Sequence, residues 1–138
     1  MDISGLTKAV RKALPLKYCG AVIVAAGSAS RVQGIDKVMA ELDGEPMILR
    51  TVRTFQNTDS IREIVVVTRE DLIMPIMKLC VPFEKITAVV AGGSSRQESV
   101  MHGLNALSSK VQTVAVQDGA RPLVTPELID AVILKADR

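Results

Sequence analysis

Short apolar runs alternate with amphipathic segments along most of this chain. The runs are continuous and rich in Val, Ile and Ala, as expected of strands that are buried on both faces of a sheet. They occupy residues 20–25, 64–67, 86–90 and 111–116. Apolar residues at helical spacing predict helices near residues 46–55, 71–80, 100–107 and 126–133. This alternation predicts a right-handed βαβ series, so the expected fold class is α/β: an open, mostly parallel, doubly wound Rossmann-like sheet with helices on both faces.

Individual residues add detail to two of the predicted helices. Pro46 suits the first turn of the first helix, where its missing amide hydrogen does no harm. Asp71 suits the N-cap of the second helix. Met74 and Met77 lie on that second helix, and we expect them to fill the core from one of its faces.

The pattern divides the chain into an extension and one domain. Residues 1–18 precede the first strand and are expected to be an N-terminal extension, either a short amphipathic helix or a solvated segment. Residues 19–138 are expected to form the α/β domain. Since the chain stops on its last predicted helix with no closing strand, we expect this domain to be incomplete at its C-terminus.

Composition narrows the class of protein. Aromatic residues are nearly absent (two Phe, one Tyr, no Trp), which favours helices on a parallel sheet over a β-sandwich. Lys and Arg outnumber Asp and Glu by only 17 to 15, which argues against a dedicated nucleic-acid binder. Cys19 and Cys80 have no metal-ligand neighbours, and no signal peptide or membrane-spanning run is found. These observations predict a cytoplasmic protein without disulfides or structural zinc.

Small residues and two cations follow the first predicted strand. Small side chains let a ligand approach the backbone, and successive amides in a tight loop can bind an anion. Two basic side chains nearby suit a polyphosphate. The small residues are Ala25, Ala26, Gly27 and Ser28, and the cations are Arg31 and Lys37. Neither the P-loop motif nor the dinucleotide fingerprint is present, and an ordinary turn with two solvated cations remains an alternative.

Two glycines and a polar helix start follow the third predicted strand. Gly92 and Gly93 allow positive φ and close backbone contact, while the helix start offers free amides and the Ser99 hydroxyl. A planar base could be bound there. Simple capping is the alternative, with Ser94 or Ser95 as the N-cap and Glu98 three or four residues later.

The fourth predicted strand leads to an acidic turn. Asp118 is placed to meet a magnesium–phosphate complex or a ribose hydroxyl, with Gly119 directly after it. Arg121 would pair with Asp118 or face an anionic substrate, and a purely structural turn is the alternative. His102, the single histidine, has no partner for a triad or metal site, so we expect a packing or surface role.

Taken in order, these segments resemble the 2-C-methyl-D-erythritol 4-phosphate cytidylyltransferases of the non-mevalonate isoprenoid pathway. The matching residues are Ala25-Ala26-Gly27 through Arg31, Lys37, Leu42-Asp43-Gly44-Glu45-Pro46, Gly92-Gly93, Arg96-Gln97-Glu98-Ser99-Val100, Gly103-Leu104 and Asp118-Gly119-Ala120-Arg121-Pro122. The resemblance covers roughly residues 19–138 and implies a nucleotide-diphospho-sugar transferase type of Rossmann-like sheet, here truncated.

The resemblance also implies roles for these residues. Arg31 and Lys37 would be catalytic, gripping the CTP phosphates while the acceptor phosphate attacks the α-phosphorus and pyrophosphate leaves. The nucleotide-binding residues would be Ala25, Ala26, Gly27, Ser28, Gly92, Gly93, Ser99, Asp118 and Gly119. Asp118 would also lie near a Mg²⁺ cofactor, mostly through the phosphates, and Arg121 would support that loop. The partners implied are CTP and a small polyol phosphate, and family members form a homodimer through an arm in their C-terminal part.

The chain departs from the family pattern in three places. Ala29 replaces the second loop glycine, the stretch from Arg31 to Lys37 is one residue short, and Gln117 stands where a His is frequent. The part of the family that carries the dimer arm, acceptor residues and a further catalytic Lys is absent, so we expect the chain alone to be inactive or nearly so. Two alternatives stay open: a ribitol 5-phosphate cytidylyltransferase, and a non-catalytic nucleotide-binding module.

Overall fold

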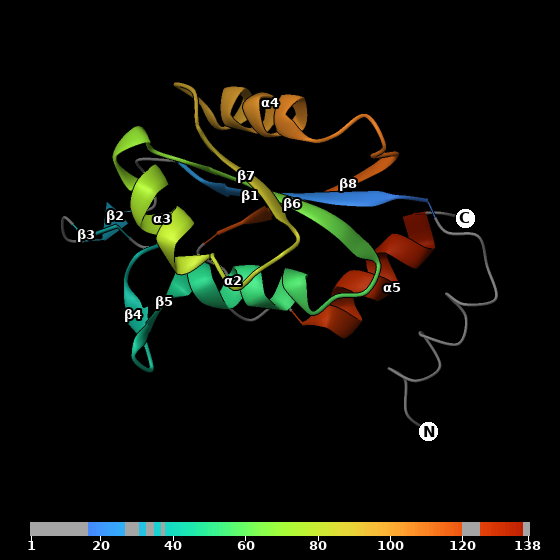
Figure 1. The fold of residues 1–138 in the computed structure, drawn as a ribbon, viewed down its shortest axis with the longest axis horizontal. Coiled ribbons are helices and arrows are strands. Elements are labelled where there is room, and N and C mark those ends of the chain that lie inside the picture. The colour runs from blue at the N-terminus through green and yellow to red at the C-terminus, as the bar shows by residue number, and fades with distance from the viewer. Residues whose placement is uncertain (1–16, 27–30, 33–34, 37, 120–124, 137–138) are drawn as a thin grey trace.

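A four-stranded parallel sheet forms the centre of the protein (Figure 1). The computed structural model describes residues 17–26, 31–32, 35–36, 38–119 and 125–136. The strand order is β7-β6-β1-β8. The strands are β1 (Cys19–Ala25), β6 (Ile61–Thr68), β7 (Ile86–Ala91) and β8 (Thr113–Asp118). All four predicted strands are therefore confirmed, although β8 is displaced two residues toward the C-terminus, which puts Asp118 at its end rather than beyond it.

Helices cover both faces of the sheet, as predicted for a doubly wound fold. Helix α4 (Arg96–Ala106) lies on one face, and α2 (Met47–Gln56) and α5 (Pro126–Ala136) lie on the other (Figure 1). Two apolar clusters fill the spaces between these layers. The α4 side is built on Val22, Val24, Val65 and Val67. The larger cluster on the other side includes Ile23, Ile48, Phe55, Ile64 and Ile76.

Two short hairpins lie between β1 and α2. The first joins β2 (Arg31–Val32) to β3 (Ile35–Asp36), and the second joins β4 (Glu41–Leu42) to β5 (Glu45–Pro46). In the second hairpin Asp43 and Gly44 both have positive φ, of 54° and 85°. An Asp-Gly pair with positive φ at both positions is the preferred two-residue turn between antiparallel strands. The pattern of apolar residues did not predict either hairpin, because two-residue strands contain too few positions to show a period.

The helix after β6 differs from its prediction. A 3₁₀ turn, η2 (Glu70–Leu72), precedes α3 (Ile73–Leu79), whose N-cap position is Leu72. Asp71 does not cap the helix, because its carboxylate accepts two hydrogen bonds from Arg69, each at 3.1 Å. The cap prediction is therefore wrong: the guanidinium of Arg69 lies within reach of Asp71 and engages its carboxylate instead.

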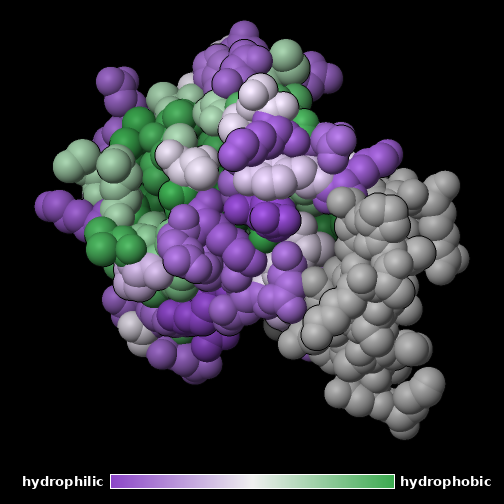
Figure 2. Space-filling view, turned by 45° about the vertical axis from the view of Figure 1, so that its right-hand side comes forward, coloured by the Kyte–Doolittle hydropathy of each residue, from purple (hydrophilic) through white to green (hydrophobic). Residues whose placement is uncertain are grey.

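The core role predicted for Met74 and Met77 is also wrong. These residues are 60% and 47% exposed, and Ile76 is the residue that α3 buries. A seven-residue helix packed beside the outer strand β7 has one face on the protein, and both methionines lie off that face. Hydrophobic residues reach the surface toward the upper left of the face drawn in Figure 2, among polar residues that cover most of the rest.

Of the described helices, none is long and apolar enough to cross a bilayer.

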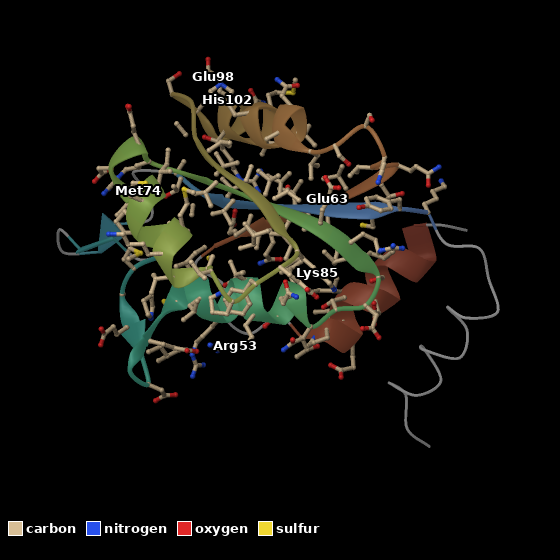
Figure 3. The ribbon with its side chains drawn as sticks, in the orientation of Figure 1. Arg53, Glu63, Met74, Lys85, Glu98 and His102 are labelled. Carbon is tan, nitrogen blue, oxygen red and sulfur yellow. The ribbon has the colours of Figure 1, made fainter. Side chains whose placement is uncertain are left out.

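A buried carboxylate ties three segments together at the amino end of the sheet. Glu63, labelled in Figure 3, belongs to β6. It is 4% exposed. It accepts hydrogen bonds from Ser108 N at 2.7 Å, from Ser108 Oγ at 2.7 Å and from Tyr18 Oη at 3.1 Å. Burial by itself would raise the pKa of Glu63, but the bonds from Ser108 and Tyr18 outweigh it and hold that pKa below its ordinary value. The carboxylate therefore holds two segments against β6: the chain after α4 and the chain before β1.

Replacing Glu63 by Gln is expected to destabilise the protein in a pH-dependent way. Since the folded pKa lies below the unfolded value of 4.5, the charged group stabilises the fold fully above 4.5 and loses this effect as pH falls through the folded pKa. Hydrogen bonds to a charged group contribute about 1.5–3 kcal/mol, which is the loss expected near neutral pH. Urea unfolding of both proteins across this pH range measures it. A gap between them that stays constant down to acid pH would contradict the assignment, and Glu84→Gln, on an exposed carboxylate, serves as the control.

Candidate functional site

The carboxyl ends of the four strands lie along one edge of the sheet. Ala25 of β1 pairs with Thr68 of β6, which pairs with Ala91 of β7. On the other side of β1, Val24 pairs with Asp118 of β8. The chain runs outward from β1 to β6 and β7 and then returns to β8 on the opposite side, so the strand order reverses between β1 and β8. In open α/β sheets ligands bind at this reversal, outside the carboxyl ends of the strands.

Gly92 brings the segments after β7 and β1 into close contact. A Cβ atom added at Gly92 would overlap the Cβ of Ala26 and would lie 2.6 Å from Ser99 Oγ. The neighbouring Gly93 N donates a hydrogen bond to that same Ser99 Oγ at 3.1 Å. The close approach expected of this glycine pair is thus present. Neither glycine uses the positive φ that its residue type allows, since among the described residues Gly44 is the glycine with positive φ.

Side chains of α4 hold the residues between β7 and α4, which we call the β7–α4 corner (residues 92–95). Ser95 is the N-cap, and its Oγ accepts a hydrogen bond from Glu98 N at 3.1 Å. Glu98 Oε2 in turn accepts from Ser94 N at 2.7 Å and from Ser94 Oγ at 2.8 Å (Figure 3). These two bonds lower the pKa of Glu98, and the bond from the Ser94 backbone has the larger effect. The predicted capping is therefore confirmed, and it fixes a corner whose next helical amides point toward the carboxyl edge.

The end of β8 is fixed from two directions. Gly119 N donates to Val24 O at 2.8 Å, and Thr51 Oγ1 of α2 donates to Gly119 O at 3.0 Å. From α4, Arg96 Nη2 donates to Asp118 Oδ1 at 3.3 Å. Sequence reasoning gave no role to Thr51 or Arg96. A charged residue at the first position of a helix that follows a glycine pair was the available signal for Arg96, but its partner lies 22 residues away in the sequence.

Several predicted site residues lie outside the described residues. These are Gly27, Ser28, Lys37 and Arg121. Arg31 belongs to β2, where its backbone pairs with Asp36. The structure therefore brings together Ala25, Ala26, Gly92, Gly93, Ser99, Asp118 and Gly119 at the carboxyl edge, and the position of the cationic pair relative to them stays a prediction.

The titratable residues near the site show whether it could hold a metal ion. The exposed His102 lies with Nδ1 3.0 Å from Ala91 O, which agrees with a packing or surface role (Figure 3). The described ranges contain no cluster of three or more His, Cys, Asp or Glu side chains that could hold a metal. Asp118 is the carboxylate at the end of β8. Mg²⁺ is commonly bound by one or two carboxylates together with substrate phosphates, so these residues fit an ion that arrives with a nucleotide.

A family comparison agrees with this geometry. Residues 19–138 match the family model of 2-C-methyl-D-erythritol 4-phosphate cytidylyltransferase. The chain belongs to this cytidylyltransferase family. A relative of that name from Dehalococcoides mccartyi (strain CBDB1) is 40% identical over 112 residues, which is 80% of this chain and 49% of the relative.

Solved structures show the same architecture. The 4-diphosphocytidyl-2C-methyl-D-erythritol synthase of Anaerococcus prevotii superposes with a TM-score of 0.77 at 30% identity, over 88% of this chain and 52% of that one. A CMP:2-keto-3-deoxy-manno-octonic acid synthetase solved with CTP has a TM-score of 0.68 at 16% identity, over 86% of this chain and 47% of that one, a likeness of fold alone. The chain thus spans about half the length of the cytidylyltransferases that it matches, and the half it spans contains the four strand ends described above.

Proposed function

We propose that this chain is the CTP-binding part of an enzyme that transfers CMP from CTP to 2-C-methyl-D-erythritol 4-phosphate and releases pyrophosphate. The observation that carries the proposal is that the segment after β7 contacts the ends of two other strands. Gly92 lies against Ala26, after β1, and against Ser99 of α4, while Arg96 pairs with Asp118 at the end of β8. Family membership supplies the donor and the acceptor, because the matching relatives are named for this reaction.

Each group in the proposed site has a physical task. The backbone around Ala26 and the β7–α4 corner would receive the cytosine and ribose, because glycines there have no side chain to keep a planar base away from the backbone. Arg31 and Lys37 would hold the triphosphate, and their charge would offset the charge that develops as the acceptor phosphate attacks in line. Asp118 would hold Mg²⁺ together with the phosphates, and the ion would supply further charge neutralisation.

A direct binding measurement tests this proposal. In isothermal titration with Mg²⁺ present, we expect the chain to bind CTP at least about tenfold more tightly than UTP or ATP, since a pocket that hydrogen-bonds one base leaves polar groups unpaired with another. Asp118→Asn is expected to weaken CTP binding in Mg²⁺ and to have a smaller effect in EDTA. Equal affinity for CTP and ATP, or tight NAD binding without CTP binding, would overturn the proposal.

A further inference from the structure

Arg96 forms an ion pair in the site but has no functional role among those given so far. Arg96 is the first residue of α4, and Asp118 is the last residue of β8. Their contact at 3.3 Å connects a helix that follows β7 to the strand on the far side of β1. The ion pair therefore lies at the strand-order reversal, which is where the proposed nucleotide would lie.

This ion pair is built to be exchanged. The side chains of Arg96 and Asp118 are 61% and 41% exposed, and a solvated ion pair contributes little to stability. A triphosphate carries more negative charge than one carboxylate and presents oxygens in the fork geometry that a guanidinium prefers. A phosphate group arriving at the start of α4 would thus compete successfully for Arg96.

The neighbouring charges favour the same exchange. Arg96 lies at a helix N-terminus, where the helix dipole and the free amides attract anions and disfavour a cation. An anion bound there neutralises both the dipole and Arg96. A divalent ion near Asp118, in contrast, is repelled by the guanidinium for as long as Arg96 stays paired with that carboxylate.

We propose that Arg96 is a positioning residue that changes partner when nucleotide binds. Before binding, its guanidinium is a counter-ion of Asp118; after binding, it contacts the nucleotide phosphates and leaves the Asp118 carboxylate to the metal that accompanies them. The inference rests on the proposed function, since it takes CTP as the ligand. Its consequence is that metal and CTP bind cooperatively, and that part of this cooperativity passes through Arg96.

The test compares CTP affinity with Mg²⁺ and with EDTA, measured by isothermal titration, for the wild-type chain and three variants. Arg96→Gln removes the guanidinium, and Arg96→Lys keeps the charge. Arg62→Gln is the matched control, because Arg62 lies at the amino end of β6, 5.1 Å from the Tyr18 ring and at the opposite edge of the sheet. The quantity of interest is the ratio of the dissociation constant in EDTA to that in Mg²⁺.

We expect Arg96→Gln to weaken CTP binding in EDTA and to reduce this ratio about three- to tenfold, because metal no longer gains from the release of Asp118. Arg96→Lys is expected to retain part of the ratio, and Arg62→Gln all of it. A merely structural role for Arg96 would weaken binding equally with and without metal and leave the ratio unchanged, which would overturn the inference while the proposed function stands. A wild-type chain that binds no CTP in either condition would overturn both.

Discussion

Replacing Gly92 by Ala is expected to weaken CTP binding about tenfold or more while the chain remains folded. The added methyl group would overlap the Cβ of Ala26, which cannot rotate away because it is fixed to the backbone after β1. It would also press on Ser99 Oγ, the acceptor of the bond from Gly93 N. The β7–α4 corner and the chain after β1 would have to separate, and the proposed base pocket lies between them. Isothermal titration with CTP in Mg²⁺ measures the loss.

Two further variants distinguish this local effect from general damage. Gly20→Ala makes the same chemical change at the amino end of β1, where the new methyl group meets the flexible end of Leu107 at 2.9 Å. It should leave CTP affinity unchanged. Ala26→Gly in the Gly92→Ala background removes the overlapping methyl group and should restore part of the affinity. Full-strength CTP binding by Gly92→Ala alone would show that the β7–α4 corner is not part of the nucleotide site.

Replacing Gly103 by Val is expected to lower the free energy of unfolding by about 3 kcal/mol. Gly103 is the buried glycine of α4, and a Cβ there would overlap Val22 Cγ1 and lie 2.9 Å from Val67 Cγ2. Both valines are fully buried in central strands, and their branched side chains have little freedom to rotate. The helix would have to lift from the sheet. Urea unfolding followed by circular dichroism measures the change.

Asn105→Val provides the matched control for this prediction. Asn105 is exposed on the same helix, two residues further on, so the same side chain is introduced without entering the core. Its effect should stay within about 0.5 kcal/mol, as for most surface changes. Equal destabilisation by the two variants would mean that helix propensity, rather than close packing at Gly103, sets the cost.

The sequence predicted the sheet well because its strands are buried on both faces. Such strands need unbroken apolar runs, and residues 20–25 and 64–67 form runs of this kind that no exposed segment would require. Partial burial weakens the signal, so β8, with one neighbour among the described strands, was placed two residues early. Likewise, nothing in the sequence alone distinguishes an exposed methionine from a buried one at the same helical spacing, which is why Met74 and Met77 were misplaced.

The candidate site was predictable in its parts. Glycine pairs and polar residues directly after strands are local signals, and they indicated Gly92, Gly93, Ser99 and Asp118. Arg96 and Thr51 were missed because their importance lies in a partner far along the chain. Arg96 reaches Asp118, and Thr51 reaches the carbonyl of Gly119 across 68 residues.

The sequence by itself determined which segments become strands and helices, because burial on two faces or one face leaves a period in the order of apolar and polar residues. It also indicated the family, through short motifs in a fixed order. Only the tertiary structure decided which residues face each other at the carboxyl edge: the overlap distance at Gly92, the Arg96–Asp118 pair and the support from Thr51. Those contacts depend on the strand order β7-β6-β1-β8, which folds the chain back on itself and brings distant residues within hydrogen-bonding distance.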